Sequence, residues 1–208
     1  MMFKKLISVV VAIVMVLSVS MALAKTIEPE EPEMERLAGR TVHATVGEYI
    51  DFLNAFRVTV YEDDRFDDDD IIGLKAGDIL LVGGQPLTVK EMSTTPDEVA
   101  MAIMDDGSEI VFLDNGEGFG ACSTDDDRIY MHAIAVLLLS PAEGIVYEDN
   151  SDPDLDAEMI VYKGLENILA AKAVKEETSI GFDFYATTVT LSDTLEIVKI
   201  HQNFDVAQ

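Results

Sequence analysis

The chain has 208 residues and a formal net charge of −26, from 40 Asp and Glu against 14 Lys and Arg. This length suits one domain or two small ones. Because so acidic a chain repels phosphates, we expect no binding to nucleic acid and none to anionic membranes. Hydrophobic residues make up 49% of the chain, which excludes a disordered acidic tail. The single cysteine excludes an intramolecular disulfide.

The first 24 residues have the layout of a secretory signal peptide. Lys4 and Lys5 form a positive n-region, an apolar run of 14 residues spans 6–19, and Ala22 to Ala24 is a small-residue cleavage site. The run is shorter than the roughly 20 apolar residues of a membrane-spanning helix. We therefore expect cleavage after Ala24 and a secreted or extracytoplasmic protein. Loss of the two lysines leaves 12 basic and 40 acidic side chains, a net charge of −28.

The segment 25–39 begins with alternating Glu and Pro, which predicts an extended, solvated acidic leader. A β-rich domain is expected over 40–208. A division of this domain near 141–144 is the alternative, because a Pro-Ala-Glu-Gly sequence interrupts the strand pattern there.

Short apolar runs broken by turn residues predict many strands. Gly83 and Gly84 predict a tight turn, and Asp106-Gly107 predicts a second hairpin, with a helix starting at Thr95 as its alternative. The segment 48–53 fits a strand or a short helix, and we assign it to strand. The predicted strands are 41–46, 48–53, 56–61, 79–82, 87–90, 99–104, 109–113, 129–139, 145–147, 159–162, 182–191 and 195–200.

The nearly continuous apolar run 129–139 predicts a strand that is buried on both faces. One helix is predicted over 165–175, where apolar and polar residues separate at helical spacing. Strands repeating about every ten residues indicate a mainly β fold. We expect either a small antiparallel barrel, SH3-like or OB-like over 41–113, or a sandwich, extended by a C-terminal hairpin and containing one short helix.

Cys122, with His132 and the acidic run 125–127, is the obvious candidate for nucleophilic catalysis. A reactive thiolate needs a neighbouring base or positive charge. Three aspartates would instead raise the pKa of the thiol, although Arg128 offsets part of their charge. We therefore expect a structural thiol, with an intermolecular disulfide as an alternative role.

Two further patterns lack the context that their chemistry requires. Residues 116–121 match the dinucleotide-binding pattern G-x-G-x-x-A, but no amphipathic helix follows to hold a pyrophosphate. We expect a glycine-rich surface loop there. His43, His132 and His201 are scattered and do not have zinc-ligand spacing. No cofactor other than calcium is suggested.

Two acidic clusters in predicted loops are the candidate metal sites. Residues 62–70 hold seven acids in nine positions, and residues 148–158 hold six in eleven. Calcium takes 6–8 oxygen ligands, and extracellular sites bind it weakly. The second cluster fails as an EF-hand loop, because Ala157 and Lys163 stand where glycine and the bidentate glutamate belong. Solvated loops are the simpler interpretation, and a weak calcium site is the alternative. The candidate calcium ligands are Asp67, Asp68, Asp69, Asp70, Asp152, Asp154 and Asp156.

These features favour a secreted, acidic, β-rich module that binds an unidentified extracellular partner without catalysis. The alternative is a secreted hydrolase with a carboxylate-based or Cys122-based site, whose catalytic residues the sequence does not single out. A third class is a subunit or fibre component, which would expose a long unpaired strand edge.

Overall fold

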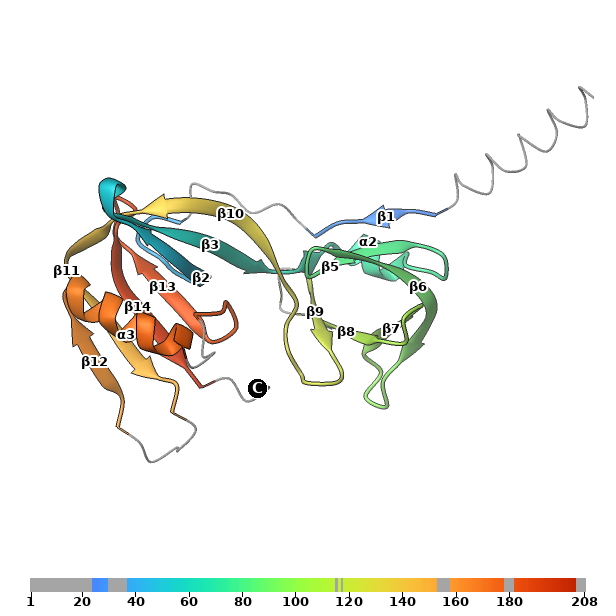
Figure 1. Cartoon of the computed structure of the whole chain (residues 1–208). Helices are drawn as coiled ribbons and strands as arrows, with labels where there is room; N and C mark the ends of the chain where they lie inside the picture. The colour runs from blue at the N-terminus through green and yellow to red at the C-terminus, as the bar shows by residue number, and fades with distance from the viewer. Residues whose placement is uncertain are drawn as a thin grey trace, which may run out of the picture. The chain divides into compact units, whose positions relative to one another are not determined.

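The structure, a computed structural model, describes residues 24–29, 37–114, 116, 118–152, 158–177 and 182–204. The described residues are mainly β: strands account for 55% of them and form two sheets, and only one helix among them is longer than two turns. Figure 1 shows the order of these elements along the chain. The mainly β prediction is thus confirmed. Neither sheet is closed into a barrel, so of the two predicted architectures the barrel is not the one observed.

The chain divides into two compact units that alternate along the sequence. Among the described residues, unit 1 contains 24–29 and 63–130, and unit 2 contains 37–62 and 131–204. A barrel over 41–113 is therefore wrong, because 41–62 pair within the sheet of unit 2.

Unit 1 contains one sheet with the strand order β1-β5-β6-β7-β8-β9-β4. All neighbours in it are antiparallel except β1 and β5, which run parallel. Phe66, Leu80, Met104, Ile110 and Phe112 are buried in its core. The elements are β1 (Thr26–Ile27), β4 (Arg65–Phe66), α2 (Asp68–Ile72), β5 (Ile79–Val82), β6 (Gln85–Thr94), β7 (Ala100–Met104), β8 (Glu109–Asp114) and β9 (Phe119–Ser123).

The predicted leader is partly built into this sheet. Thr26 and Ile27 pair in parallel with Ile79 and Leu80, and the Ile27 side chain is only 2% exposed. The expectation of a wholly solvated leader is therefore wrong at this point, because one apolar residue among the charges is enough to anchor a short strand in the core. Residues 30–36 lie outside the described part of the chain.

Both predicted hairpins of unit 1 are confirmed. Gly83 and Gly84 have φ of 56° and 72°, as a two-residue turn between antiparallel strands requires. The helix considered at Thr95 does not form. The Thr95 hydroxyl instead accepts the Val99 N–H at 3.2 Å, and Glu98 adopts a left-handed conformation with φ of 65°.

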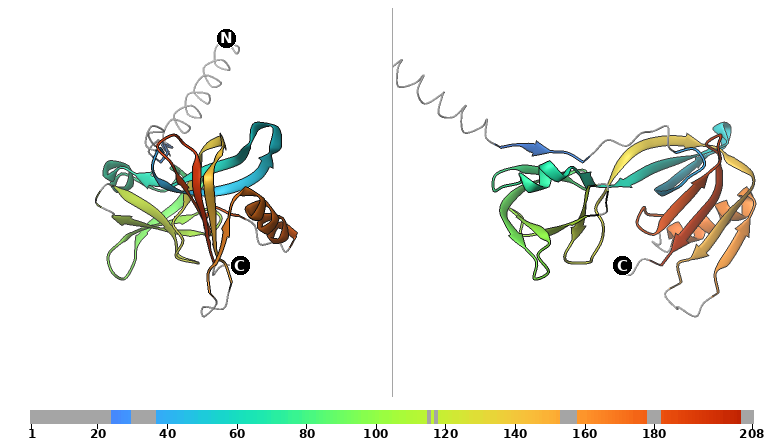
Figure 2. Two further views of the ribbon diagram at one scale, coloured as in Figure 1. Left: turned by 90° about the vertical axis from the view of Figure 1, so that its left-hand side faces the viewer. Right: turned by 180° about the vertical axis from the view of Figure 1, so that it is seen from behind.

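Unit 2 contains one sheet with the strand order β10-β3-β2-β13-β14-β11-β12. The β11–β14 pair is parallel, whereas β2–β3, β2–β13, β13–β14 and β11–β12 are antiparallel. Figures 1 and 2 show α3 lying against one side of this sheet, where Ile168 is fully buried. The elements are β2 (Thr41–Ile50), η2 (Asp51–Leu53), β3 (Ala55–Asp63), β10 (Met131–Leu139), β11 (Pro141–Asn150), β12 (Ile160–Lys163), α3 (Leu165–Glu177), β13 (Thr187–Leu191) and β14 (Ile197–Asn203).

Local turns shift two predicted strand ends. The segment 48–53 is strand only to Ile50 and then forms a 3-10 turn, which ends at Asn54 with φ of 49°. The strand predicted at 182–191 is β13, which begins at Thr187 rather than Phe182. The Asp183 carboxylate accepts the N–H groups of Tyr185 and Ala186 at 3.0 and 3.1 Å, and these bonds favour a turn. The helix predicted at 165–175 is confirmed as α3.

The apolar strand β10 is not buried on both faces as predicted. Met131 and Leu139 at its ends are buried, but Val136 is 66% exposed and Leu138 is 53% exposed. The reason is topological, since β10 is the last strand of its sheet and pairs only with β3 within the described residues. Composition alone does not distinguish a central apolar strand from an apolar edge strand.

Candidate functional site

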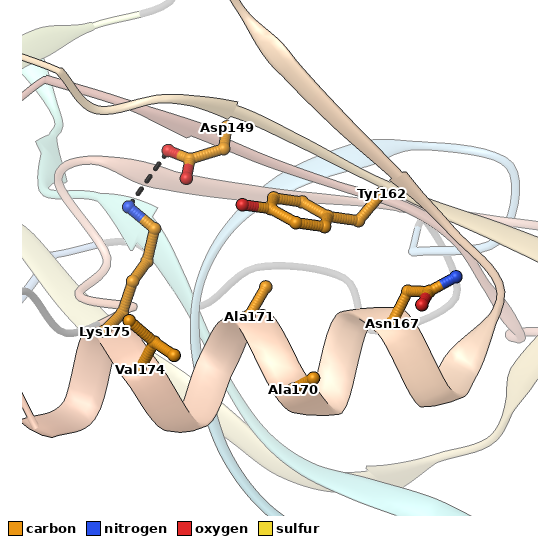
Figure 3. A pocket seen from close by; sticks show the side chains of 7 residues that line it. All are labelled: Asp149, Tyr162, Asn167, Ala170, Ala171, Val174 and Lys175. Carbon is orange, nitrogen blue, oxygen red and sulfur yellow. Dashed lines mark ion pairs between the residues drawn. The ribbon is translucent and has the colours of Figure 1, made fainter.

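A pocket of about 490 Å³ lies between α3 and the strands β11 and β12 of unit 2. The helix presents two alanines to it, Ala170 and Ala171, so that little side-chain volume fills the space. Figure 3 shows the Tyr162 ring above the helix, with its hydroxyl pointing toward Asp149 and Lys175. The lining residues are Asp149, Tyr162, Asn167, Ala170, Ala171, Val174 and Lys175.

The polar end of this pocket is an ion pair. The Lys175 ammonium lies 3.0 Å from the Asp149 carboxylate, and the two side chains are only 13% and 10% exposed. Burial by itself would raise the pKa of Asp149, but hydrogen bonds from Ser151 and Lys175 outweigh it and hold the pKa below its usual value. Asp149 is therefore a paired carboxylate at neutral pH, a poor general acid and a weak base.

The aromatic floor beside the pocket belongs to the core. Tyr147 and Tyr162 stack with ring centroids 5.4 Å apart, and the Tyr147 hydroxyl donates to Gln202 at 2.7 Å. Burial, and then the negative charge of Asp149, raise the pKa of Tyr147 well above its ordinary value. Tyr147 is therefore a neutral structural residue across the physiological pH range.

A second hollow, of about 540 Å³, lies in unit 2 at the end of the edge strand β10. It is lined by residues 137–140 and 194–196. Leu138 and Leu195 are 53% and 40% exposed here, so apolar surface faces outward in both segments. The last three residues of β10 line this hollow, so it adjoins the exposed part of the strand.

The structure does not activate Cys122. The thiol lies in β9 of unit 1 and is 7% exposed, whereas His132 lies in β10 of unit 2. Burial, followed by the charges of Asp63 and Asp127, raises the pKa of the Cys122 thiol. This is the opposite of what nucleophilic catalysis requires. Neither Cys122 nor His132 lines either of the two pockets described above.

The glycine motif leads into a strand and not into a helix. Phe119 to Ser123 form β9, so no helix N-terminus is available for a pyrophosphate at this point. Gly118 has a structural role instead. Its φ is 128°, and a Cβ atom there would lie 2.8 Å from the Phe66 carbonyl oxygen.

Two of the three histidines have ordinary hydrogen-bond partners in the sheet of unit 2. His43 contacts the Phe184 carbonyl oxygen at 3.0 Å, and His201 contacts Glu148 at 3.2 Å and Asn203 at 3.0 Å. Because Lys199 also approaches Glu148 at 3.2 Å, this group is a cross-strand charge cluster.

The two acidic clusters differ in their surroundings. Asp68 to Asp70 lie in the short helix α2 rather than in a loop, with Asp67 just before it, and Asp70 forms an ion pair with Lys25. In the second cluster Asp152 is described, but Asp154 and Asp156 lie outside the described residues. Among the described residues, no group of three or more His, Cys, Asp or Glu is arranged to hold a metal ion. The calcium site stays a prediction.

Sequence reasoning did not single out the residues that line the hollows. Asp149 lies inside the second acidic cluster, but nothing in the sequence shows that Lys175, 26 positions later, is its partner. The exposure of Val136 and Leu138 was likewise hidden within an apolar run. One signal was available for β10: the run Met131–Leu139 contains no charged residue.

Comparisons with known proteins give no relative. The chain matches no protein-family model, no curated protein and no solved structure. The geometry of the described residues is therefore the basis for any statement on function.

Proposed function

We propose that this chain is an exported, non-catalytic binding module that takes up an extended segment of a partner protein as an added strand along β10. The observation that carries the proposal is the nature of this edge. β10 ends the sheet of unit 2, is nine residues long, and contains no charged residue in a chain with a net charge of −26.

The other strands that end the two described sheets differ from β10. β1 and β4 have two residues each, and β12 has four and ends at Lys163. Short edge strands and edge lysines are ordinary protections against unwanted strand pairing. β10 has neither protection, and Val136 and Leu138 expose apolar surface beside an edge that no other described strand covers. An edge of this length without protection is typical of strand addition.

The hollow at the end of β10 provides the second element of recognition. Main-chain hydrogen bonds along an edge give affinity without sequence preference, and a side-chain pocket adds specificity. The apolar lining from Leu138 and Leu195 favours an aliphatic side chain of the partner. The charge of the chain favours a partner whose flanking residues are basic.

The location outside the cytoplasm is part of the same proposal. It rests on the layout of the first 24 residues, with cleavage after Ala24. Within the described residues, no helix has the length and apolarity needed to cross a bilayer. We also propose that the strongly acidic chain binds neither nucleic acid nor anionic lipid. No observation on the described pockets favours the hydrolase alternative.

A peptide titration tests strand addition. The probe is a fluorescent peptide of nine alternating Val and Thr residues with a lysine pair at each end, and binding is measured by anisotropy. We expect saturable binding that Val136→Lys weakens by about tenfold or more, equivalent to about 1.4 kcal/mol. Ile72→Lys is the matched control, since Ile72 is 79% exposed but lies in α2 of unit 1.

Two outcomes contradict the proposal. One is absence of binding, and the other is equal weakening by Val136→Lys and Ile72→Lys, which would indicate nonspecific attraction to apolar surface. Sedimentation of the chain without peptide measures self-association and so distinguishes a third outcome. Self-association that Val136→Lys abolishes, without peptide binding, would make the occupant of the edge a second copy and not a partner.

A further inference from the structure

Asp78, which immediately precedes β5 in unit 1, is a buried carboxylate with an unusual set of partners. Its side chain is 1% exposed, and its two oxygens accept the backbone N–H groups of Lys25 and Lys75 at 3.0 and 3.2 Å. Lys25 leads directly into β1, and its carbonyl oxygen accepts the Ile79 N–H at 2.8 Å. The carboxylate thus lies at the point where β1 enters the sheet.

No cation pairs with this carboxylate within the described residues. The side-chain ammonium of Lys25 pairs with Asp70 instead, and no other described lysine or arginine forms an ion pair with Asp78. A buried carboxylate loses a large hydration free energy, and neutral N–H donors compensate less of it than a hydrogen-bonded cation does. A positive charge on the backbone nitrogen of Lys25 would therefore stabilise the Asp78 carboxylate.

We infer that Asp78 is the binding site for the α-ammonium group of Lys25 that signal-peptide removal creates. Hydrolysis of the Ala24–Lys25 peptide bond consumes one water and yields an Ala24 carboxylate and a Lys25 amine, which takes up a proton at neutral pH. The nitrogen concerned already lies 3.0 Å from the Asp78 oxygen. Processing therefore turns a neutral hydrogen bond into a charge-assisted one at the same place.

The consequence is a sheet that becomes more stable when the chain is processed. β1 contributes the buried Ile27 to the core of unit 1, and the Lys25 nitrogen is the first main-chain contact that holds it there. The precursor has the same contact without the charge, so its unit 1 is held less firmly. This inference rests on cleavage after Ala24. It does not depend on strand addition at β10, which concerns unit 2.

The test compares the mature chain beginning at Lys25 with a chain that retains Ala24, each with Asp78 and with Asp78→Asn. Retention of Ala24 moves the ammonium group one residue away. We expect it to lower the Tm by about 2–4 °C when Asp78 is present and to leave it unchanged with Asp78→Asn. Asp70→Asn is the matched control: it removes the partner of the Lys25 side chain, and the Tm difference between the two N-termini should persist.

An unchanged Tm on retention of Ala24, or an equal loss with Asp78 and with Asp78→Asn, would overturn the inference. If Asp78→Asn does not fold, a labelling experiment on the mature chain replaces the melting comparison. The N-terminus is acylated at neutral pH by a succinimidyl ester, and peptide mapping locates the acylated amine. The α-amine should react more slowly in the folded mature chain than in urea, since a bound ammonium is unreactive; equal rates contradict the site. An intact mass of exported protein that does not begin at Lys25 also contradicts it.

Discussion

Lys175 of α3 and Asp149 of β11 form an ion pair across the pocket of unit 2, with their nitrogen and oxygen atoms 3.0 Å apart. Lys175 also contacts the Ser151 hydroxyl, which itself donates to Asp149 at 2.7 Å. This network joins the helix to the sheet at the polar end of the pocket, which small alanine side chains of α3 also line. The ion pair therefore adds to the apolar contact that Ile168 of α3 makes in the core.

Lys175→Met should destabilise the protein by leaving the Asp149 charge without its cationic partner. Removal of one member of a largely buried pair costs about 2–3 kcal/mol in the free energy of unfolding. Denaturant titration measures this loss. The double variant Asp149→Asn, Lys175→Met should lose less than the sum of the two single losses. Lys90→Met, at an exposed lysine of β6, is the control and should cost close to nothing; equal losses at the two lysines contradict the role of the pair.

The same pair predicts a pH dependence in the acid range. Since the folded pKa of Asp149 lies below its ordinary value of 3.8, its contribution to stability is fully present above that value and is lost as the pH falls through the folded pKa. The difference in unfolding free energy between the natural chain and Asp149→Asn should therefore be constant from about pH 5 to 7 and should shrink below about pH 4. A difference that grows on acidification would contradict this assignment.

The Cys122 thiol should be unreactive in the folded protein. Its pKa is raised, first by burial and then by Asp63 and Asp127, so little thiolate forms near neutral pH. Reaction with a chromogenic disulfide reagent should be slow in buffer and fast in urea, with a single thiol released. A fast reaction in buffer that depends on His132 would instead support a catalytic thiol. Cys122→Ala should leave peptide binding at β10 unchanged.

The local chemistry of the chain predicted its hairpins well. Gly83 with Gly84, and Asp106 with Gly107, determine turns through residues that tolerate positive φ or cap the turn, and the structure places both turns as expected. Alternating apolar and polar residues predicted β3 and β13, because successive side chains of a pleated strand point to opposite faces of the sheet.

What the sequence did not predict depends on contacts between distant segments. Ile27 is buried only because β5 accepts a parallel neighbour more than 50 residues away. Val136 is exposed on β10, the strand that ends its sheet. The pairing of Lys175 with Asp149 needs both the helix and the strand in place. No local pattern carries this information, because each feature is a property of strand order and not of composition.

Calcium binding is tested by melting the protein in 10 mM calcium and in sodium chloride of the same ionic strength. A site with a Kd near 1 mM would add about 1.4 kcal/mol, which raises the Tm by roughly 3–6 °C. Sodium screens the carboxylates without organising oxygen ligands around an ion, so coinciding melts would show that the clusters are solvated. Asparagine at the exposed Asp67, Asp68 and Asp69 locates a site while sparing Asp70, the partner of Lys25. Asparagine at Asp152, Asp154 and Asp156 tests the second cluster.

Amide hydrogen exchange with and without the alternating Val–Thr peptide tests strand addition at β10 most directly. An added strand would bond the outward-facing N–H groups of Met131–Leu139, so we expect slower exchange on peptide binding at alternate residues of this segment and little change in β12, the other edge of the sheet. Val136→Lys should remove the effect. Protection that appears along α3 and β12 with no change in β10 would contradict strand addition and would place the peptide in the Asp149–Lys175 pocket instead.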